Sequence, residues 1–191
     1  MNNSNKHINF DLLVIGGGAA GFFTAINCAQ QHPNLKIAIL EKTKNLLSKV
    51  KVSGGGRCNV THAEFDPNEL AKNYPRGHKE LRGPFHQFAT GDMMAWLADE
   101  NIPLKIEEDG RIFPKSDSSQ TIIDAFLAAC NKFNIEIKSQ CGVEDFQLTD
   151  DHLWKVTTKN ESFLAKYLVF ASGSSLKVWQ LLKNKKYTII D

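Results

Sequence analysis

Apolar runs and a glycine-rich segment alternate in the first 41 residues. An apolar run over residues 10–15 leads into Gly16–Gly21, a helical stretch follows, and a second apolar run, Ile37–Leu40, ends at Glu41. Short apolar runs bounded by glycines are typical of strands that are buried on both faces. The order predicts a strand, a tight turn, a helix that starts near Ala19, and a second strand parallel to the first.

The middle of the chain is more polar and less periodic. It contains three prolines between residues 62 and 86, and Asp109-Gly110 stands between two short apolar segments, which is a strong hairpin signal. We expect residues 62–117 to form an excursion from the core, with a short helix over 67–72, a helix over 90–100, and a hairpin made by 104–107 and 111–113.

The last part of the chain returns to strand patterns. We expect a helix from Ser118 or Ser119 to about Phe133, strands over 135–138, 143–148 and 153–158, and a last strand within 163–171. The continuous apolar run Tyr167–Ala171 is typical of a strand buried on both faces. The final residues, Thr188–Asp191, suggest the opening of a further strand.

These elements predict an α/β fold. The expected architecture is a doubly wound, mainly parallel, Rossmann-like sheet of the FAD- or NAD(P)-binding type, with a β-meander as its crossover and a truncated C-terminal end. We expect residues 1–191 to be one FAD-binding domain, the N-terminal portion of a longer protein whose inserted substrate domain and final FAD motif are absent.

The first glycine cluster carries specific chemistry. Gly16, Gly18 and Gly21 fit G-x-G-x-x-G, in which the glycines allow a tight turn, close approach of a pyrophosphate, and close packing of helix on strand. The helix N-terminus would present free N–H groups to the phosphates. Glu41, 20 residues beyond Gly21, could accept hydrogen bonds from a ribose diol and would repel the 2′-phosphate of NADP. FAD and NAD both remain compatible with this fingerprint.

A second cluster, Ser53–Asn59, reads Ser-Gly-Gly-Gly-Arg-Cys-Asn. Successive glycines let backbone amides converge on a phosphate or pack against a flat ring. Arg57 could place its guanidinium beside a pyrophosphate, and Asn59 could bond to ring-edge atoms. A flexible linker is the alternative interpretation.

Composition and net charge limit the kinds of partner that the chain could bind. A net charge of +2, with 42% hydrophobic and 23% charged residues, describes an ordinary globular protein and argues against a nucleic-acid partner. No apolar run is long enough for a membrane span, and Met1–His7 lacks a signal-peptide core. The four cysteines, Cys28, Cys58, Cys130 and Cys141, show neither C-x-x-C nor zinc-ligand spacing. We therefore expect a cytoplasmic protein with reduced thiols and no metal site.

Several motifs together resemble one family. The chain has Gly-Gly-Gly-Ala-Ala-Gly21, Leu-Glu-Lys42, Lys49, the Ser53–Asn59 cluster followed by Val-Thr61, Asp109-Gly-Arg-Ile-Phe-Pro114, and Leu-Val-Phe-Ala-Ser-Gly173. This set resembles the BaiN/YhiN-like, or aminoacetone-oxidase-like, FAD-dependent flavoproteins of bacteria. One departure is that the family commonly has Gly-Arg or Gly-Lys where this chain has Leu47-Ser48.

The resemblance implies FAD as the cofactor and oxidoreductase chemistry on a small molecule, with NAD(P)H as a candidate electron donor. It places the Ser53–Asn59 cluster near the flavin and pyrophosphate, and it assigns backbone contacts to Val143 and to Ser172-Gly173. Val143 could equally be a core strand residue. The expected cofactor contacts are Gly16, Gly18, Ala19, Ala20, Gly21, Glu41, Lys42, Lys49, Ser53, Gly54, Gly55, Gly56, Arg57, Cys58, Asn59, Val143, Ser172 and Gly173.

Two other functions stay open from the sequence. A non-catalytic FAD-binding fragment or interaction module is one alternative, because the chain stops short of the domain that would hold substrate. An NAD-binding dehydrogenase is disfavoured by the Ser53–Asn59 cluster and by the meander. No catalytic acid or base stands out from the sequence, although His62 is the best candidate for proton transfer. Cys58 lacks a nearby cysteine with which it could form a redox pair. The catalytic residues, the substrate and the oligomeric state are therefore not assigned.

Overall fold

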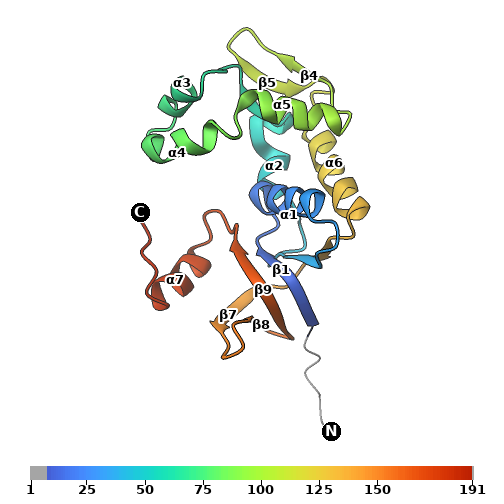
Figure 1. Ribbon diagram of the computed structural model, residues 1–191. Coiled ribbons are helices and arrows are strands. Elements are labelled where there is room, and N and C mark those ends of the chain that lie inside the picture. Colours follow the sequence, from blue (N-terminus) through green and yellow to red (C-terminus); the bar gives the residue numbers. More distant parts are fainter. Residues whose placement is uncertain (1–7, 191) are drawn as a thin grey trace. The chain divides into compact units, whose positions relative to one another are not determined.

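The computed structural model describes residues 8–190 and divides into two compact units (Figure 1). The first unit combines the segments before Lys49 and from Phe126 onward, and the second covers Lys49–Ala125. Met1–His7, where no signal peptide was expected, lies outside the described residues, as does Asp191. Within residues 8–190, no helix has the length and apolar character that a membrane crossing requires.

A six-stranded sheet forms the centre of the first unit, in the order β6-β2-β1-β9-β8-β7. Its strands are β1 (Ile8–Ile15), β2 (Ile37–Leu40), β6 (Glu136–Lys138), β7 (Val143–Leu148), β8 (Trp154–Thr158) and β9 (Ser162–Phe170). β6, β2, β1 and β9 pair in parallel, whereas β8 pairs antiparallel with both β9 and β7. The predicted Rossmann-like, mainly parallel sheet with a meander is confirmed.

Helices complete this unit. They are α1 (Ala19–Gln31), which connects β1 to β2, α6 (Ser119–Lys132), whose first turns belong to the second unit, and α7 (Leu176–Asn184). Leu13 and Val14 of β1 are fully buried, and Phe22 of α1 contacts Phe126 of α6 with ring centroids 6.0 Å apart. The central strand is therefore covered by apolar side chains, which explains its uninterrupted apolar run.

Two expectations for the C-terminal region are wrong. β9 is not buried on both faces along Tyr167–Ala171, because Tyr167 is 64% exposed and the residues after it are only half-buried. Thr188–Ile190 form no strand, and Ile190 is 86% exposed. An apolar run predicts burial only where another element packs on it: Leu168 and Phe170 pack against the core cluster, whereas Tyr167 and Ile190 stay exposed.

The second unit holds a small sheet and several short helices. Its three strands follow the order β3-β5-β4 and pair antiparallel, with the predicted hairpin between β4 and β5. The elements are α2 (Ser48–Val52), the irregular turn η1 (Ser53–Gly56), β3 (Thr61–His62), α3 (Pro67–Lys72), α4 (His78–Phe85), α5 (Thr90–Asp99), β4 (Leu104–Ile106) and β5 (Arg111–Pro114). α4 was not predicted, because its sequence contains Pro84 and buries no residue.

Candidate cofactor site

Close packing around the turn between β1 and α1 requires glycine at two positions. Gly16 has φ +118°, and a Cβ there would overlap the carbonyl oxygen of Ala171, which follows β9. A Cβ on Gly21 would overlap the carbonyl oxygen of Gly16 and so prevent the helix from lying against the turn. Both positions exclude any side chain, as the fingerprint requires.

Gly18 has a different environment. It is the N-cap residue of α1 with φ −97°, and a Cβ there would meet no atom within 4 Å. No side chain caps the helix, so the first-turn N–H groups lack a side-chain acceptor, and Ala19 and Ala20 are exposed. An uncapped helix start beside open space is suited to a phosphate, because free N–H groups and the helix dipole attract an anion.

Glu41 directly follows β2 and contacts the same turn. One carboxylate oxygen, Oε2, accepts a hydrogen bond from the Gly17 N–H at 2.8 Å. The other, Oε1, accepts from the backbone N–H and the hydroxyl of Thr43, both at 2.9 Å. These bonds fix the carboxylate, and a carboxylate has acceptor capacity beyond the three hydrogen bonds observed.

A cavity of about 300 Å³ opens at the carboxyl ends of β1 and β2. Open α/β sheets bind ligands in this position. Five of the expected contact residues line it together: Gly16, Glu41, Lys42, Val143 and Ser172. Its lining also includes residues that sequence reasoning missed, namely Ile15, Leu40, Gln140, Cys141, Gly142, Glu144, Lys159, Ser175, Lys177 and Val178. Most of these lie in loops or in the first turn of α7, where no motif marks them.

The loop after β9 contributes a second tight turn. Gly173 has φ +56°, and its carbonyl oxygen accepts a hydrogen bond from the indole Nε1 of Trp179 at 3.0 Å. Trp179 is on α7, so this helix holds the Ser172-Gly173 turn in place. Gly173 itself does not line the cavity, and neither do Gly18, Ala19, Ala20 or Gly21.

In the second unit, the Ser53–Asn59 segment is a closely built loop. Gly54, Gly55 and Gly56 have φ of 55°, 68° and 87°, and the Cys58 N–H donates to the carbonyl oxygen of Ser53 at 3.0 Å. A Cβ on Gly54 would come within 2.8 Å of the Asn59 nitrogen. The left-handed run and the closing hydrogen bond argue against a flexible linker.

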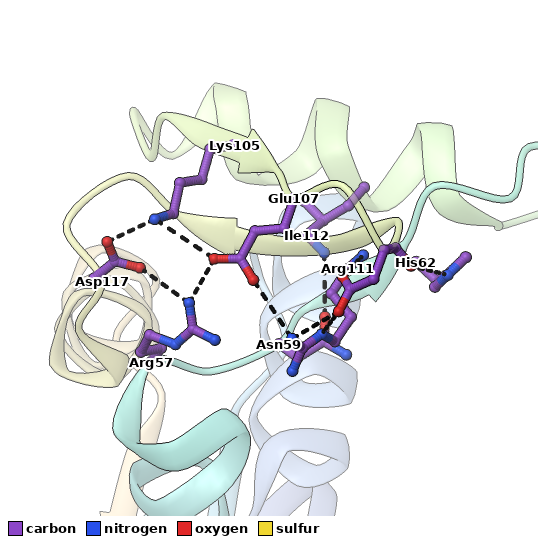
Figure 2. Close-up of polar contacts among 9 residues, drawn as sticks. Arg57, Asn59, His62, Lys105, Glu107, Arg111, Ile112 and Asp117 are labelled. Atoms are coloured by element: carbon purple, nitrogen blue, oxygen red, sulfur yellow. Dashed lines mark hydrogen bonds and ion pairs between the residues drawn. The ribbon is translucent and has the colours of Figure 1, made fainter.

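Arg57 contacts side chains of the β4–β5 hairpin and of Asp117, which follows β5 in the second unit (Figure 2). Its guanidinium forms ion pairs with Glu107, at 2.5 Å, and with Asp117, at 3.6 Å. The same group stacks 3.9 Å from the ring centroid of Phe113. Lys105 also bonds to Asp117, at 2.6 Å, and this hydrogen bond is the largest cause that lowers the pKa of Asp117. Arg57 therefore ties the glycine loop to the hairpin.

The neighbours of Arg57 also have structural partners. The Asn59 side-chain oxygen accepts from the Ile112 N–H at 3.3 Å, and Nε2 of His62 lies 3.1 Å from the Asp109 carbonyl oxygen (Figure 2). Cys58 is buried, and burial raises the pKa of its thiol, which disfavours the reactive thiolate. Lys49 is exposed on α2. The expected flavin contacts of this loop stay a prediction.

The sequence matches one family over almost its whole length. The model of the HI0933-like protein Rossmann domain covers residues 10–191. The 3-dehydro-bile acid delta(4,6)-reductase of Clostridium scindens is 27% identical over 84% of this chain and 38% of the relative. The ribosomal RNA dihydrouridine synthase of Escherichia coli is 29% identical over 68% of the chain and 31% of the relative. The chain thus spans about a third of the length of these curated relatives.

Solved structures show the same fold. THI4 of Thermovibrio ammonificans superposes with a TM-score of 0.62 at 13% identity, over 94% of this chain and 63% of that protein. The FrdA subunit of Escherichia coli quinol fumarate reductase gives 0.61 at 19% identity, over 87% of this chain and 33% of that protein. The flavoprotein subunits of fumarate reductase are also among the sequence relatives, which agrees with FAD as the expected cofactor. The chain belongs to the HI0933-like protein Rossmann domain family, the FAD-binding family that its glycine motifs indicated.

Proposed function

We propose that this chain binds FAD, with the AMP half of the cofactor at the β1–α1 turn and in the cavity beside it. The observation that carries the proposal is the position of Glu41, which contacts the glycine turn and lines the cavity at the same time. A dinucleotide needs both features together: an open helix start for its phosphates and an acceptor for its ribose. The fit extends to Gly18, where open space lets a phosphate approach the backbone.

We further propose that the protein containing this chain is a flavin-dependent oxidoreductase. Bound FAD would supply hydride or electron transfer to or from a small molecule, and the described residues would bind it and hold its orientation. Support comes from relatives named as a bile acid reductase and an L-aspartate oxidase. NAD(P)H is the electron donor we propose, and its binding residues are not assigned to this chain.

A cytoplasmic location belongs to the same proposal. Its support is the state of the cysteines: Cys28, Cys58, Cys130 and Cys141 are all free thiols in the structure. Reduced cysteines are the usual state in the cytosol. A fusion of the chain to a fluorescent protein, followed by fractionation of the producing cells, tests this location against a secreted one.

Calorimetric titration of the purified chain tests FAD binding. FAD, FMN, ADP and NAD are the four ligands to compare. The proposal expects saturable binding of FAD, competition by ADP, and little affinity for FMN, because FMN lacks the AMP half that Glu41 and the glycine turn would hold. Binding of NAD with no binding of FAD would support the dehydrogenase alternative instead, and FMN binding as tight as FAD binding would contradict the assignment of the AMP half.

A further inference from the structure

A second cavity, of about 400 Å³, adjoins the cavity proposed for the cofactor. It is lined by the end of β6, by the loop that follows β6, and by the turn between β8 and β9. The two cavities share four lining residues, which are Gln140, Cys141, Gly142 and Lys159. These residues therefore form the boundary between the two cavities.

The backbone at this boundary is bound to the segment that starts with Glu41. The Cys141 N–H donates to the Glu41 carbonyl oxygen at 2.8 Å, and the Gln140 N–H donates to the Thr43 carbonyl oxygen at 3.0 Å. In an AMP unit the ribose connects the phosphate to the base. If the phosphates lie at the glycine turn and the ribose lies at Glu41, the base is the part of the ligand that reaches the wall containing Gln140.

The side chain of Gln140 has the chemistry that recognises adenine. Adenine presents its N6 amino group beside an acceptor ring nitrogen, and a side-chain amide pairs with both atoms at once. Of the four shared residues, only Gln140 has a side chain that is both a strong donor and a strong acceptor, since lysine only donates and a thiol bonds weakly. The Gln140 amide is exposed and bonds to no other residue within 8–190, so it is available to a ligand.

The turn itself does not require glutamine at this position. Gln140 has φ +54°, in the left-handed region, where glycine is free of strain and asparagine is tolerated better than most residues. Glycine would therefore keep the backbone of the turn and both of the hydrogen bonds that hold it, while removing only the amide side chain.

We propose that Gln140 is a further cofactor-binding residue, whose side-chain amide pairs with the adenine edge and makes the cavity selective for adenine over guanine nucleotides. This inference rests on the proposed function, since it assumes that the AMP half occupies the cavity. It adds a side-chain contact to the backbone contact expected of Val143.

The test compares Gln140→Gly with Asn134→Gly. Asn134 is also an exposed amide residue in the left-handed region, with φ +53°, and it lies outside the lining of both cavities. We expect the wild type to bind ADP at least about tenfold more tightly than GDP, and Gln140→Gly to lose about tenfold in ADP affinity while its GDP affinity changes less than about twofold. Asn134→Gly should leave both affinities unchanged.

Calorimetry measures the affinities, and thermal unfolding without ligand checks the fold. Both glycine variants should be at least as stable as the wild type, because each relieves left-handed strain. If Gln140→Gly binds ADP as tightly as the wild type, or loses ADP and GDP affinity equally, the inference is overturned.

A charged variant of the same length tests the recognition itself. The carboxylate of Gln140→Glu only accepts hydrogen bonds, so it suits the N1–H and amino donors of guanine and repels the acceptor ring nitrogen of adenine. We expect the ratio of ADP affinity to GDP affinity to fall about tenfold or more. Gln147→Glu, on an exposed position of β7 outside both cavities, adds the same charge and should keep the wild-type ratio.

A ratio that stays at the wild-type value in Gln140→Glu would contradict the inference. Failure of the wild-type chain to bind either FAD or ADP would instead reject the proposed function on which it rests.

Discussion

The Glu41 carboxylate accepts a hydrogen bond from the Gly17 backbone N–H at 2.8 Å, across 24 residues of sequence. This contact joins the acid at the end of β2 to the glycine turn at the end of β1. A Cβ on Gly17 would come within 2.9 Å of the Glu41 Cβ, so the two segments are already in close contact. The acid that should recognise a ribose therefore also organises the turn that should hold the phosphates.

Replacement of Glu41 by alanine is expected to weaken FAD binding by about 1–3 kcal/mol, the cost of losing a charge-assisted hydrogen bond. The turn also loses the partner of the Gly17 N–H, so part of the effect comes from its loosened geometry. Fluorescence titration of FAD measures the loss. Glu144→Ala, which removes a second cavity carboxylate that does not follow β2, is the matched control and should have a smaller effect. Equal losses of FAD affinity in the two variants would contradict a specific role of Glu41 in cofactor binding.

Alanine substitutions at two glycines of the turn should distinguish an effect on stability from an effect on FAD affinity. Gly21→Ala forces a Cβ against the Gly16 carbonyl oxygen and should destabilise the chain by about 1–3 kcal/mol or more, as overpacking does. Gly18→Ala meets open space at an ordinary φ, so the fold should keep nearly its full stability while FAD affinity falls, because the methyl group occupies the approach of the phosphate.

Urea unfolding and FAD titration of both variants check this pair. The expected pattern is a Gly21→Ala protein with reduced stability and a Gly18→Ala protein with normal stability but reduced affinity. A Gly18→Ala variant that binds FAD as well as the wild type would show that no phosphate comes close to this position.

Leu47 occupies a backbone conformation that suits glycine. Its φ is +52°, yet its side chain is only 1% exposed, and its N–H donates to the Gly17 carbonyl oxygen at 2.8 Å. Strain in the left-handed region costs about 1–2 kcal/mol, whereas loss of a buried leucine side chain costs about 2–5 kcal/mol, so burial outweighs strain.

Leu47→Gly and Leu47→Ala should therefore both destabilise the protein, but in an unusual order. Leu47→Ala loses the side chain and keeps the strain, while Leu47→Gly loses the side chain and relieves the strain. We expect the glycine variant to be the more stable of the two by about 1 kcal/mol. Urea unfolding measures both, and an alanine variant more stable than the glycine variant would contradict the backbone conformation at this position.

The charge cluster of the second unit predicts a pH dependence. The hydrogen bond and charge of Lys105, with the charge of Arg57, lower the pKa of Asp117. A carboxyl group whose pKa is lower in the folded state stabilises the fold above its unfolded pKa of about 3.9, and this stabilisation is lost as the pH falls through the folded pKa. Asp117 has φ +52°, a conformation that asparagine tolerates well.

Asp117→Asn should therefore lower the melting temperature near neutral pH and reduce its further fall between about pH 5 and about pH 2. Thermal unfolding over this range gives the comparison. Asp150→Asn, in an exposed turn, serves as the control and should follow the wild-type curve. An Asp117→Asn curve parallel to that of the wild type would mean that the ion pairs of Asp117 do not contribute to acid sensitivity.

The sequence predicted the features that depend on neighbouring residues. The β1–α1–β2 order, the glycine turn, Glu41 and the Asp109-Gly110 hairpin are all specified within short segments, and the structure has each of them. The features that it did not reveal depend on distant partners. The contact of Arg57 with a pyrophosphate stays a prediction, and its ion pair with Glu107, 50 residues away, was not foreseen because no local pattern signals such a pair.

The same reason explains why the start of α7, and the cavity residues beside it, were not located from the sequence. α7 is stabilised by contacts of Leu181 and Leu182 with the core and by the Lys185–Asp145 ion pair, and its N-cap residue Ser175 forms no side-chain capping hydrogen bond. The cavity is formed by strand ends and loops that come together only in the folded sheet, so ten of its fifteen lining residues were not predicted.

Flavin binding by the chain itself tests the central claim most directly. The purified 191-residue chain is incubated with FAD, freed of unbound ligand, denatured, and its released flavin is identified and counted per mole of protein. The account predicts one FAD per chain, reduced in Gly18→Ala and displaced by ADP. A folded chain that retains no FAD, or that retains it equally in Gly18→Ala and in the presence of excess ADP, would contradict the assignment of the glycine turn and its cavity as the cofactor site.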